Sequence, residues 1–190
     1  MVAPVVQALQ VTPLTEQAVV GLGSNLGDAR GHLLAALEGL GRLHDRLGLR
    51  LVGVSPLYRT APWQTEGPDF LNAVAVLEGA GDEQAPQRLL STLLELERTQ
   101  GRERPFRYAP RTLDLDLILF GQRVMDTAAL QLPHPRALQR AFVLQPLLDL
   151  APHMEWPGLG CLWRHHLDNL HDPAPQPLDD PDWPALPMKR

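Results

Sequence analysis

The chain has a single cysteine, Cys161, among its 190 residues. One cysteine excludes an internal disulfide and a zinc site built from several cysteines. No run of apolar residues approaches the roughly 20 that a membrane-spanning helix needs. The stretch from Met1 to Glu16 carries no lysine or arginine ahead of its apolar residues, so it is a poor secretory signal. We therefore expect a soluble, cytoplasmic protein.

The sequence also lacks a surplus of positive charge. It has 17 lysines and arginines against 22 acidic residues, a formal net charge of −5. That balance argues against a general nucleic-acid surface, because such surfaces neutralise phosphates with cations. No G-x-x-x-x-G-K-[ST] sequence is present, which excludes a P-loop. Hydrophobic residues make up 44% of the chain, enough for a core, and the length suits one domain.

The stretch RTLDLDLILFG, from Arg111 to Gly121, is the most informative part of the chain. Its apolar residues predict a buried strand, and Asp114 and Asp116 stand two positions apart within it. Residues i and i+2 of a strand share a face, roughly 6.5–7 Å apart. Two buried like charges need a cation between them, and Mg²⁺ suits carboxylates that also take substrate phosphates. A solvated edge strand with two exposed acids would show the same pattern.

A cluster of arginines lies directly upstream of this strand. Guanidinium groups match phosphate oxygens bidentately. Carboxylates that hold metal, beside arginines that neutralise phosphates, suit a magnesium–nucleoside triphosphate complex. Any one of these arginines alone is more simply a surface charge, but the whole cluster is harder to explain in that way. Its members are Arg98, Arg102, Arg104, Arg107 and Arg111.

The apolar patterns predict the order strand, helix, strand, strand, helix, strand. The strands are expected at 18–22, 49–57, 70–77 and 115–120, with helices that begin after Asp28 and at Pro86, and a further helix over 142–150. This order is that of a ferredoxin-like βαββαβ core, an α+β fold with a mainly antiparallel sheet. Residues 1–16 are expected to be a loose N-terminal extension. The Pro/Asp-rich residues 172–190 are expected to be an extended or disordered tail with few buried contacts, which leaves 17–171 as one domain.

The sequence PRTLDLD, from Pro110 to Asp116, resembles the signature of the 6-hydroxymethyl-7,8-dihydropterin pyrophosphokinases, enzymes of folate biosynthesis. The similarity covers roughly residues 17–170 and includes weaker matches in the family's order. These are GSNLG at 23–27, YRT at 58–60, FLNA at 70–73, LPHPR at 132–136 and RAF at 140–142. The resemblance implies that further helices cover the other side of the sheet, which gives three αβα layers.

The resemblance also implies an activity. Pyrophosphate would pass from ATP to the hydroxymethyl oxygen of the pterin, leaving AMP and the pterin diphosphate. Asp114 and Asp116 would bind two Mg²⁺ ions, and Arg102 and Arg111 would neutralise charge in the transition state. The ATP-binding residues would be Glu97, Arg104, Arg107, Arg111, Leu117, His134 and Arg140. We expect a monomer that binds these two small molecules and neither nucleic acid nor a membrane.

A pterin site is implied on the same grounds. Asn72 is the one polar residue in an apolar run, and its amide can match the alternating donors and acceptors of a pterin edge. A core amide satisfied by backbone groups is the simpler interpretation of the same residue. Flat heterocycles are held between aromatic faces. The implied pterin-binding residues are Thr60, Ala61, Trp63, Phe70, Asn72, Tyr108 and Phe142.

Two other functions remain open at this point. A ferredoxin-like core with a basic loop can be a non-catalytic RNA-binding module, although no RNP motif is present. Asp114 and Asp116 can also form the two-metal site of a nuclease. Saturable binding of a pterin would exclude both alternatives.

Overall fold

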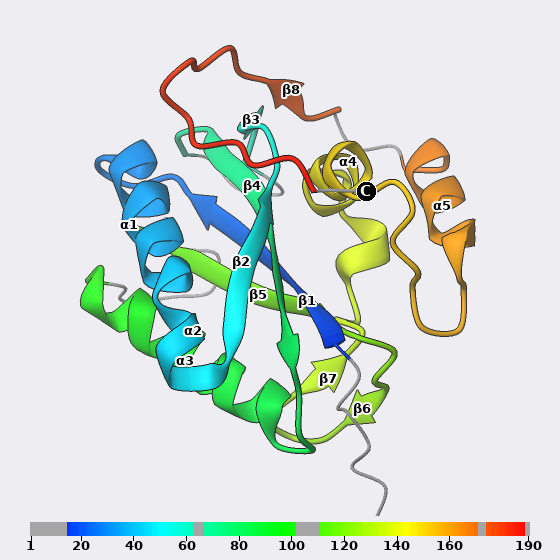
Figure 1. Cartoon of the computed structure of the whole chain (residues 1–190). Coiled ribbons are helices and arrows are strands. Elements are labelled where there is room, and N and C mark those ends of the chain that lie inside the picture. Colours follow the sequence, from blue (N-terminus) through cyan, green and yellow to red (C-terminus); the bar gives the residue numbers. More distant parts are fainter. Residues whose placement is uncertain (1–14, 63–66, 102–110, 171–173, 189–190) are drawn as a thin grey trace, which may run out of the picture.

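The computed structural model describes residues 15–62, 67–101, 111–170 and 174–188 (Figure 1). Within them, one large sheet is covered by helices on both faces, so the expected three-layer α+β architecture is confirmed. None of the helices in these ranges is long and apolar enough to cross a membrane.

The large sheet is antiparallel at every pairing between described strands. Strand β1 (Thr15–Ser24) lies between β4 (Phe70–Ala80) and β5 (Asp114–Phe120). Strands β2 (Leu49–Val54) and β3 (Tyr58–Thr60) both pair with β4. The order β5-β1-β4-β2 is that of the expected βαββαβ core. The expected strand at 49–57 ends at Val54, and β3 is a separate strand that the apolar pattern did not distinguish.

Short elements complete the chain. Strands β6 (Met125–Asp126) and β7 (Gln131–Leu132) form a two-stranded sheet, and β8 (Gln176–Pro177) pairs with β3. The helices are α1 (Ala29–Gly41), α2 (Leu43–Leu47), α3 (Ala85–Thr99), α4 (Ala141–Leu150) and α5 (His165–Asp168). Two 3₁₀ helices, η1 (Ala137–Gln139) and η2 (Cys161–Arg164), precede α4 and α5.

Alternation along the strands divides the core into two layers. Val20 and Leu22 of β1 belong to the cluster that packs on α1, α2 and α3, whereas Val19 belongs to the cluster on α4. Figure 1 shows α1, α2 and α3 on one side of the sheet and α4 and α5 on the other. The side chain of Asp28 caps α1 by accepting a hydrogen bond from the Gly31 amide at 2.9 Å, as the sequence predicted.

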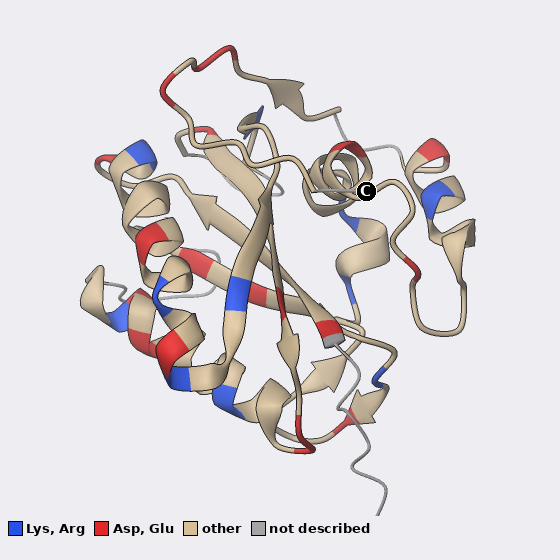
Figure 2. Ribbon diagram, in the orientation of Figure 1, with Lys and Arg blue, Asp and Glu red and all other residues tan. Residues whose placement is uncertain are grey.

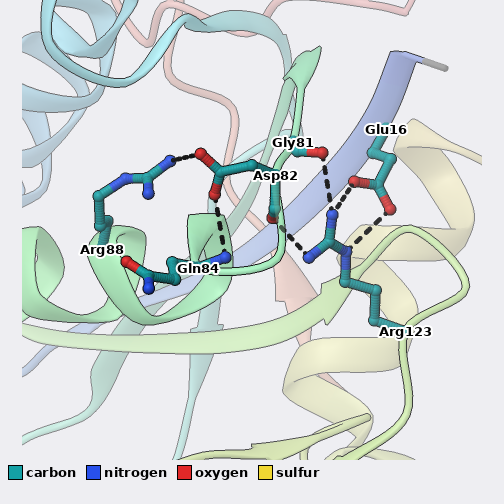
Figure 3. Close-up of polar contacts among 6 residues, drawn as sticks. All are labelled: Glu16, Gly81, Asp82, Gln84, Arg88 and Arg123. Atoms are coloured by element: carbon teal, nitrogen blue, oxygen red, sulfur yellow. Dashed lines mark hydrogen bonds and ion pairs between the residues drawn. The ribbon is translucent and has the colours of Figure 1, made fainter. Parts of the chain in front are cut away.

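An ion-paired cluster fixes the start of β1 (Figure 3). The Arg123 guanidinium donates to both carboxylate oxygens of Glu16, at 3.0 and 2.5 Å, and to the backbone oxygens of Gly81 and Asp82. The Asp82 carboxylate in turn pairs with Arg88 at 2.9 Å. Glu16 is thus part of a strand, and the prediction that residues 15 and 16 belong to a loose extension was wrong. Residues 1–14 lie outside the described part of the chain.

The C-terminal residues 174–188 pack against the domain, so the expectation of an extended tail with few buried contacts was also wrong. Trp183 is only 6% exposed, and its indole Nε1 donates to the backbone oxygen of Ser55 at 2.8 Å. Composition misled the prediction for two reasons. Proline is compatible with an edge strand, where Pro177 lies. One buried tryptophan also removes a large apolar area from water.

Candidate active site

The register of the sheet brings the sequence-predicted acids and Asn72 onto one face. Gly23 of β1 lies opposite Asn72 of β4 on one side and opposite Asp114 of β5 on the other. Two residues earlier, Gly21 lies opposite Asp116. Residues i and i+2 share a face, and Gly23 places no side chain between Asp114 and Asn72. A Cβ atom on Gly23 would lie 3.3 Å from Asn72 Oδ1 and 3.9 Å from Asp114 Cβ.

Each acid is paired with an arginine. Arg140 Nη1 donates to Asp116 Oδ2 at 2.9 Å, and Arg111 Nη1 donates to Asp114 Oδ2. The acid side chains are 21% and 35% exposed for Asp114 and Asp116. Strand β5 does end the sheet on this side, and Figure 2 shows acidic positions along it. The alternative of two merely solvated acids does not describe this arrangement, because both carboxylates are partly enclosed and held by cations.

His134 lies beside the second acid. Its Nε2 is 4.0 Å from Asp116 Oδ2, and its Nδ1 accepts a hydrogen bond from the Arg136 amide at 3.2 Å. Burial lowers the pKa of His134 below its usual value; the charges of Arg140 and Arg136 lower it further, and Asp116 opposes them. A neutral ring that accepts at Nδ1 carries its proton on Nε2. His134 is therefore arranged to donate one hydrogen bond towards the carboxylate side of the site.

A pocket of about 580 Å³ opens beside β5, within the size range of small-molecule sites. Helix α3 contributes one apolar wall, and the chain from β6 to His134 contributes the opposite side. Among the sequence-predicted residues, the pocket includes Glu97, Asp116, Leu117 and His134. Its other lining residues are Leu90, Leu94, Leu115, Asp126, Thr127, Ala128, Ala129, Leu130, Gln131 and Pro135.

Glu97 connects α3 to the acid-bearing strand. The side chain is buried, with the residue 2% exposed, and its Oε1 accepts a hydrogen bond from the Leu115 amide at 2.7 Å. Leu115 stands between Asp114 and Asp116. The position of the acid pair is therefore fixed in part by a carboxylate on the helix that lines the pocket.

Three of the other implied ligand residues, Thr60, Phe70 and Asn72, lie on the paired strands β3 and β4, and Phe142 lies on α4. Asn72 Nδ2 donates to Thr60 Oγ1 at 2.8 Å, so a side chain rather than a backbone group accepts from this amide. Phe70 is two residues from Asn72 on the same face, with its Cδ1 4.0 Å from the Cβ position of Gly23. Phe142 lies at the start of α4, where the Arg140 guanidinium carbon is 5.5 Å from the centroid of its ring.

The sequence did not identify the part played by Ser24 and Asn25. Asn25 Oδ1 accepts from the Arg111 amide at 2.8 Å, and Asn25 Nδ2 donates to the Pro68 oxygen at 3.2 Å. Ser24 Oγ donates to the Thr112 oxygen at 2.6 Å. These polar residues, both nearly fully buried, hold the backbone from which Arg111 reaches Asp114. The motif GSNLG, a weak match to the family, was the available signal, but nothing in it indicated these contacts.

Several predicted site residues fall outside the described ranges. They are Trp63, Arg102, Arg104, Arg107 and Tyr108. Ala61 is described and exposed at the end of β3, and Arg98 is exposed in the last turn of α3. Of the arginine cluster, the described structure therefore places Arg111 at the acids, and it adds Arg140 from a distant part of the chain.

The donor set fits a magnesium site. Asp114 and Asp116 offer carboxylate oxygens on one face of β5, whereas the described residues hold no group of three or more histidine, cysteine, aspartate or glutamate side chains suited to a metal. Mg²⁺ is usually bound through one or two carboxylates together with substrate phosphates and water. Asp116, which lines the pocket, and Asp114, two residues away on the same face, meet that requirement, provided that phosphates supply the remaining ligands.

Comparison with solved structures defines the class of the domain. A Plasmodium falciparum HPPK-DHPS structure has a TM-score of 0.63 and 14% sequence identity to this chain, and the match covers 84% of this chain and 44% of that one. A second structure of wild-type Plasmodium falciparum HPPK-DHPS with pteroate has a TM-score of 0.60. The chain spans less than half the length of these solved proteins, and at this identity the likeness defines the ferredoxin-like α+β fold alone.

Sequence comparison then gives the family. The family model for 7,8-dihydro-6-hydroxymethylpterin-pyrophosphokinase (HPPK) matches residues 19–152, and the chain belongs to this family. A Pseudomonas aeruginosa 2-amino-4-hydroxy-6-hydroxymethyldihydropteridine pyrophosphokinase is 44% identical over 145 residues, which are 76% of this chain and 86% of that protein. The mitochondrial folate synthesis bifunctional protein of Arabidopsis thaliana is 39% identical over 75% of this chain and 24% of its own length. The resemblance seen in the sequence is confirmed, and the RNA-binding and nuclease alternatives are not favoured.

Proposed function

We propose that the chain is an ATP-dependent pyrophosphokinase that acts on 6-hydroxymethyl-7,8-dihydropterin in folate biosynthesis. The observation that carries the site assignment is the row formed by Asn72, Gly23 and Asp114 across the sheet. In this row, Asn72, whose amide suits the edge of a heterocycle, lies across Gly23 from Asp114. Asp116, on the same face as Asp114, lines a pocket large enough for a nucleotide. The two substrates would then meet above the bare backbone of β1.

The nucleotide would occupy the pocket between α3 and β7. The apolar residues Leu90 and Leu94 of α3 suit a flat base, and Leu117 lines the same pocket. The phosphates would lie towards Asp114 and Asp116, where Arg111, Arg140 and the Nε2–H of His134 converge. Arg104 and Arg107 complete the proposed phosphate-binding set from the sequence.

The pterin would lie against β3 and β4. Asn72 offers amide hydrogen-bonding groups, Thr60 holds that amide in place, and Phe70 and Phe142 supply apolar ring surfaces. Ala61, Trp63 and Tyr108 belong to the proposed site on sequence grounds. Because the amide is fixed by a side-chain partner, its orientation is set before a ligand arrives.

Charge neutralisation and positioning would carry the reaction. Asp114 and Asp116 would hold two Mg²⁺ ions, which when bound would supply positive charge to neutralise the phosphates. Arg111, and Arg102 by its place in the motif, would stabilise the charge that develops on the transferred group. The fixed strand positions of Asn72 and Asp114 would orient the pterin hydroxymethyl oxygen towards the β-phosphorus. No residue of the chain needs to form a covalent intermediate.

The nucleotide product tests the proposal. An enzyme that transfers both terminal phosphates leaves AMP, whereas an ordinary kinase leaves ADP. Purified protein, Mg-ATP and the hydroxymethyl pterin are incubated and the nucleotides are separated. AMP should form in step with the pterin diphosphate. Stoichiometric ADP, or AMP with free pyrophosphate and unmodified pterin, would overturn the assignment.

The proposal includes a single catalytic domain that acts as a monomer in the cytoplasm. Sedimentation of the active protein tests its oligomeric state. A stable dimer that retains activity would correct that part without changing the reaction.

A further inference from the structure

The residues from 174 to 188, which we call the C-terminal strap, lie outside the family match at residues 19–152. The strap runs back along the outer edge of the sheet and pairs with the segment from Val54 to Arg59 (Figure 1). We propose that the strap is a positioning element for the pterin half of the site. This inference rests on the proposed pterin site and adds to it a role for a segment beyond the family domain.

The contacts of the strap are concentrated on β3 and on the chain that leads into it. Val54 and Leu186 exchange backbone hydrogen bonds at 2.8 and 2.9 Å. The Leu178 amide donates to the Leu57 oxygen at 2.8 Å, and β8 pairs with β3 through Tyr58 and Arg59. The strap thus pairs with outward-facing backbone groups along most of the segment from Val54 to Arg59.

Two side-chain anchors keep the strap in place. Trp183 is buried in the core layer of α1 and donates its indole N–H to the Ser55 oxygen at 2.8 Å. Arg30 of α1 forms a two-fold pair with Asp180, with nitrogen–oxygen distances of 2.6 and 3.1 Å. Bidentate arginine–carboxylate pairs add geometric specificity to an attraction between charges.

Strand β3 needs such support because it is short. It has three residues, and without the strap it would be an exposed edge strand, which is a marginal structure. Its inner neighbour is β4, with Tyr58 opposite Asn72 and Thr60 opposite Phe70. A shift of β3 would therefore move Thr60 away from the Asn72 amide, and the proposed pterin contacts would change with it.

The nucleotide pocket lies at the opposite edge of the sheet, beside β5. Loosening the strap should consequently weaken pterin binding and leave ATP binding nearly unchanged. If the strap served only general stability, loosening it would change the pterin KM and the ATP KM alike. Comparing the change in the pterin KM with the change in the ATP KM therefore distinguishes a positioning role from a structural one.

The test compares two buried tryptophans in the full-length protein. Trp183→Phe removes the indole N–H bonded to Ser55, and Trp163→Phe removes an equivalent N–H bonded to the Met154 oxygen at 2.7 Å in the other core layer. Trp183→Phe should raise the pterin KM about threefold to tenfold, the range of one lost hydrogen bond, with ATP KM changed less than about twofold. Trp163→Phe should lower the melting temperature without raising the pterin KM.

Equal pterin KM values for wild type and Trp183→Phe, or an equal rise in Trp163→Phe, would overturn the inference. If Trp183→Phe does not fold, Arg30→Gln removes the pair with Asp180 from the exposed side, and Arg30→Lys should restore part of the pterin affinity. Asn72→Ala, measured in parallel, tests the site on which the inference rests. If Asn72→Ala leaves the pterin KM unchanged, both assignments fall; if only Asn72→Ala raises it, the strap inference alone falls.

Discussion

The two halves of the proposed site, one for the nucleotide and one for the pterin, are built differently. The nucleotide half is an open pocket with an apolar wall and charged groups at one end, and Arg140 and His134 reach it from the chain that follows β7. The pterin half is built on paired strands, where Asn72 is bonded to Thr60 and β3 is held on both edges. A flexible polyanion can be bound by charges brought together from several segments. A small flat heterocycle needs donors and acceptors at fixed positions, which strands provide.

The largest effect is expected where the halves meet. Asp114→Asn and Asp116→Asn keep the side-chain shape but remove a metal-binding charge, so each should reduce turnover at least ~100-fold. The melting temperature should change little, because both acids are partly exposed. Turnover at saturating Mg²⁺ and thermal unfolding are measured together. Glu95→Gln, an exposed acid on α3, serves as the control, and near-normal turnover in both aspartate variants would exclude the metal assignment.

The next effect should be confined to the nucleotide half. Glu97→Ala leaves the buried Leu115 amide without the carboxylate that accepts its hydrogen bond, at a cost of about 1–3 kcal/mol. We expect a lower free energy of unfolding and a raised ATP KM. Glu97→Gln retains an acceptor oxygen and should recover most of the stability. A pterin KM that rises as much as the ATP KM would contradict the division into halves.

A smaller effect should fall on the pterin half. The phenol of Tyr58, on β3, donates a hydrogen bond to Asp149 on α4, and Gln145 Nε2 donates to the same carboxylate at 2.9 Å. Tyr58→Phe should cost roughly 1 kcal/mol, because exposed Asp149 can be rehydrated. Denaturant unfolding measures the loss. Since Phe142 lies on α4 and Thr60 on β3, pterin KM should rise and ATP KM should not.

The pair of Tyr58 and Asp149 also predicts how stability depends on pH, with little change near neutral pH. Burial raises the pKa of Tyr58, and the hydrogen bond to Asp149 and its charge raise it further. A raised folded-state pKa means that the stabilisation is complete below the ordinary value of 10.0 and is lost as the pH rises through the folded value. The chain has two tyrosines, so Tyr108→Phe isolates Tyr58. In that variant, no phenolate absorbance from Tyr58 should appear near pH 10.0 while the protein remains folded. Ionisation near that pH would show that the Tyr58 phenol is solvated.

The sequence correctly predicted those features of the fold that are determined by residues close together in the chain. Asp28 caps α1, Pro86 lies in the first turn of α3, and the acids stand on one face of β5, because capping, proline geometry and strand alternation act within a few residues. The role of Arg140 came from resemblance alone, since no periodicity links it to Asp116. The contacts of Asn25 and Trp183 join segments far apart in sequence, and neither spacing nor composition contains that information.

Gly21 and Gly23 have a consequence for how variation at this site would be detected. A Cβ at Gly21 would meet Ile118 Cδ1 at 3.5 Å, an ordinary contact, and one at Gly23 would come only slightly too close to Asn72. Neither glycine has a left-handed backbone, so alanine at either position should be tolerated by folding. The added methyl group would instead occupy the face of the sheet on which the two substrates are proposed to meet. A screen for stability or expression would pass such variants, and only an assay with both substrates would reveal them.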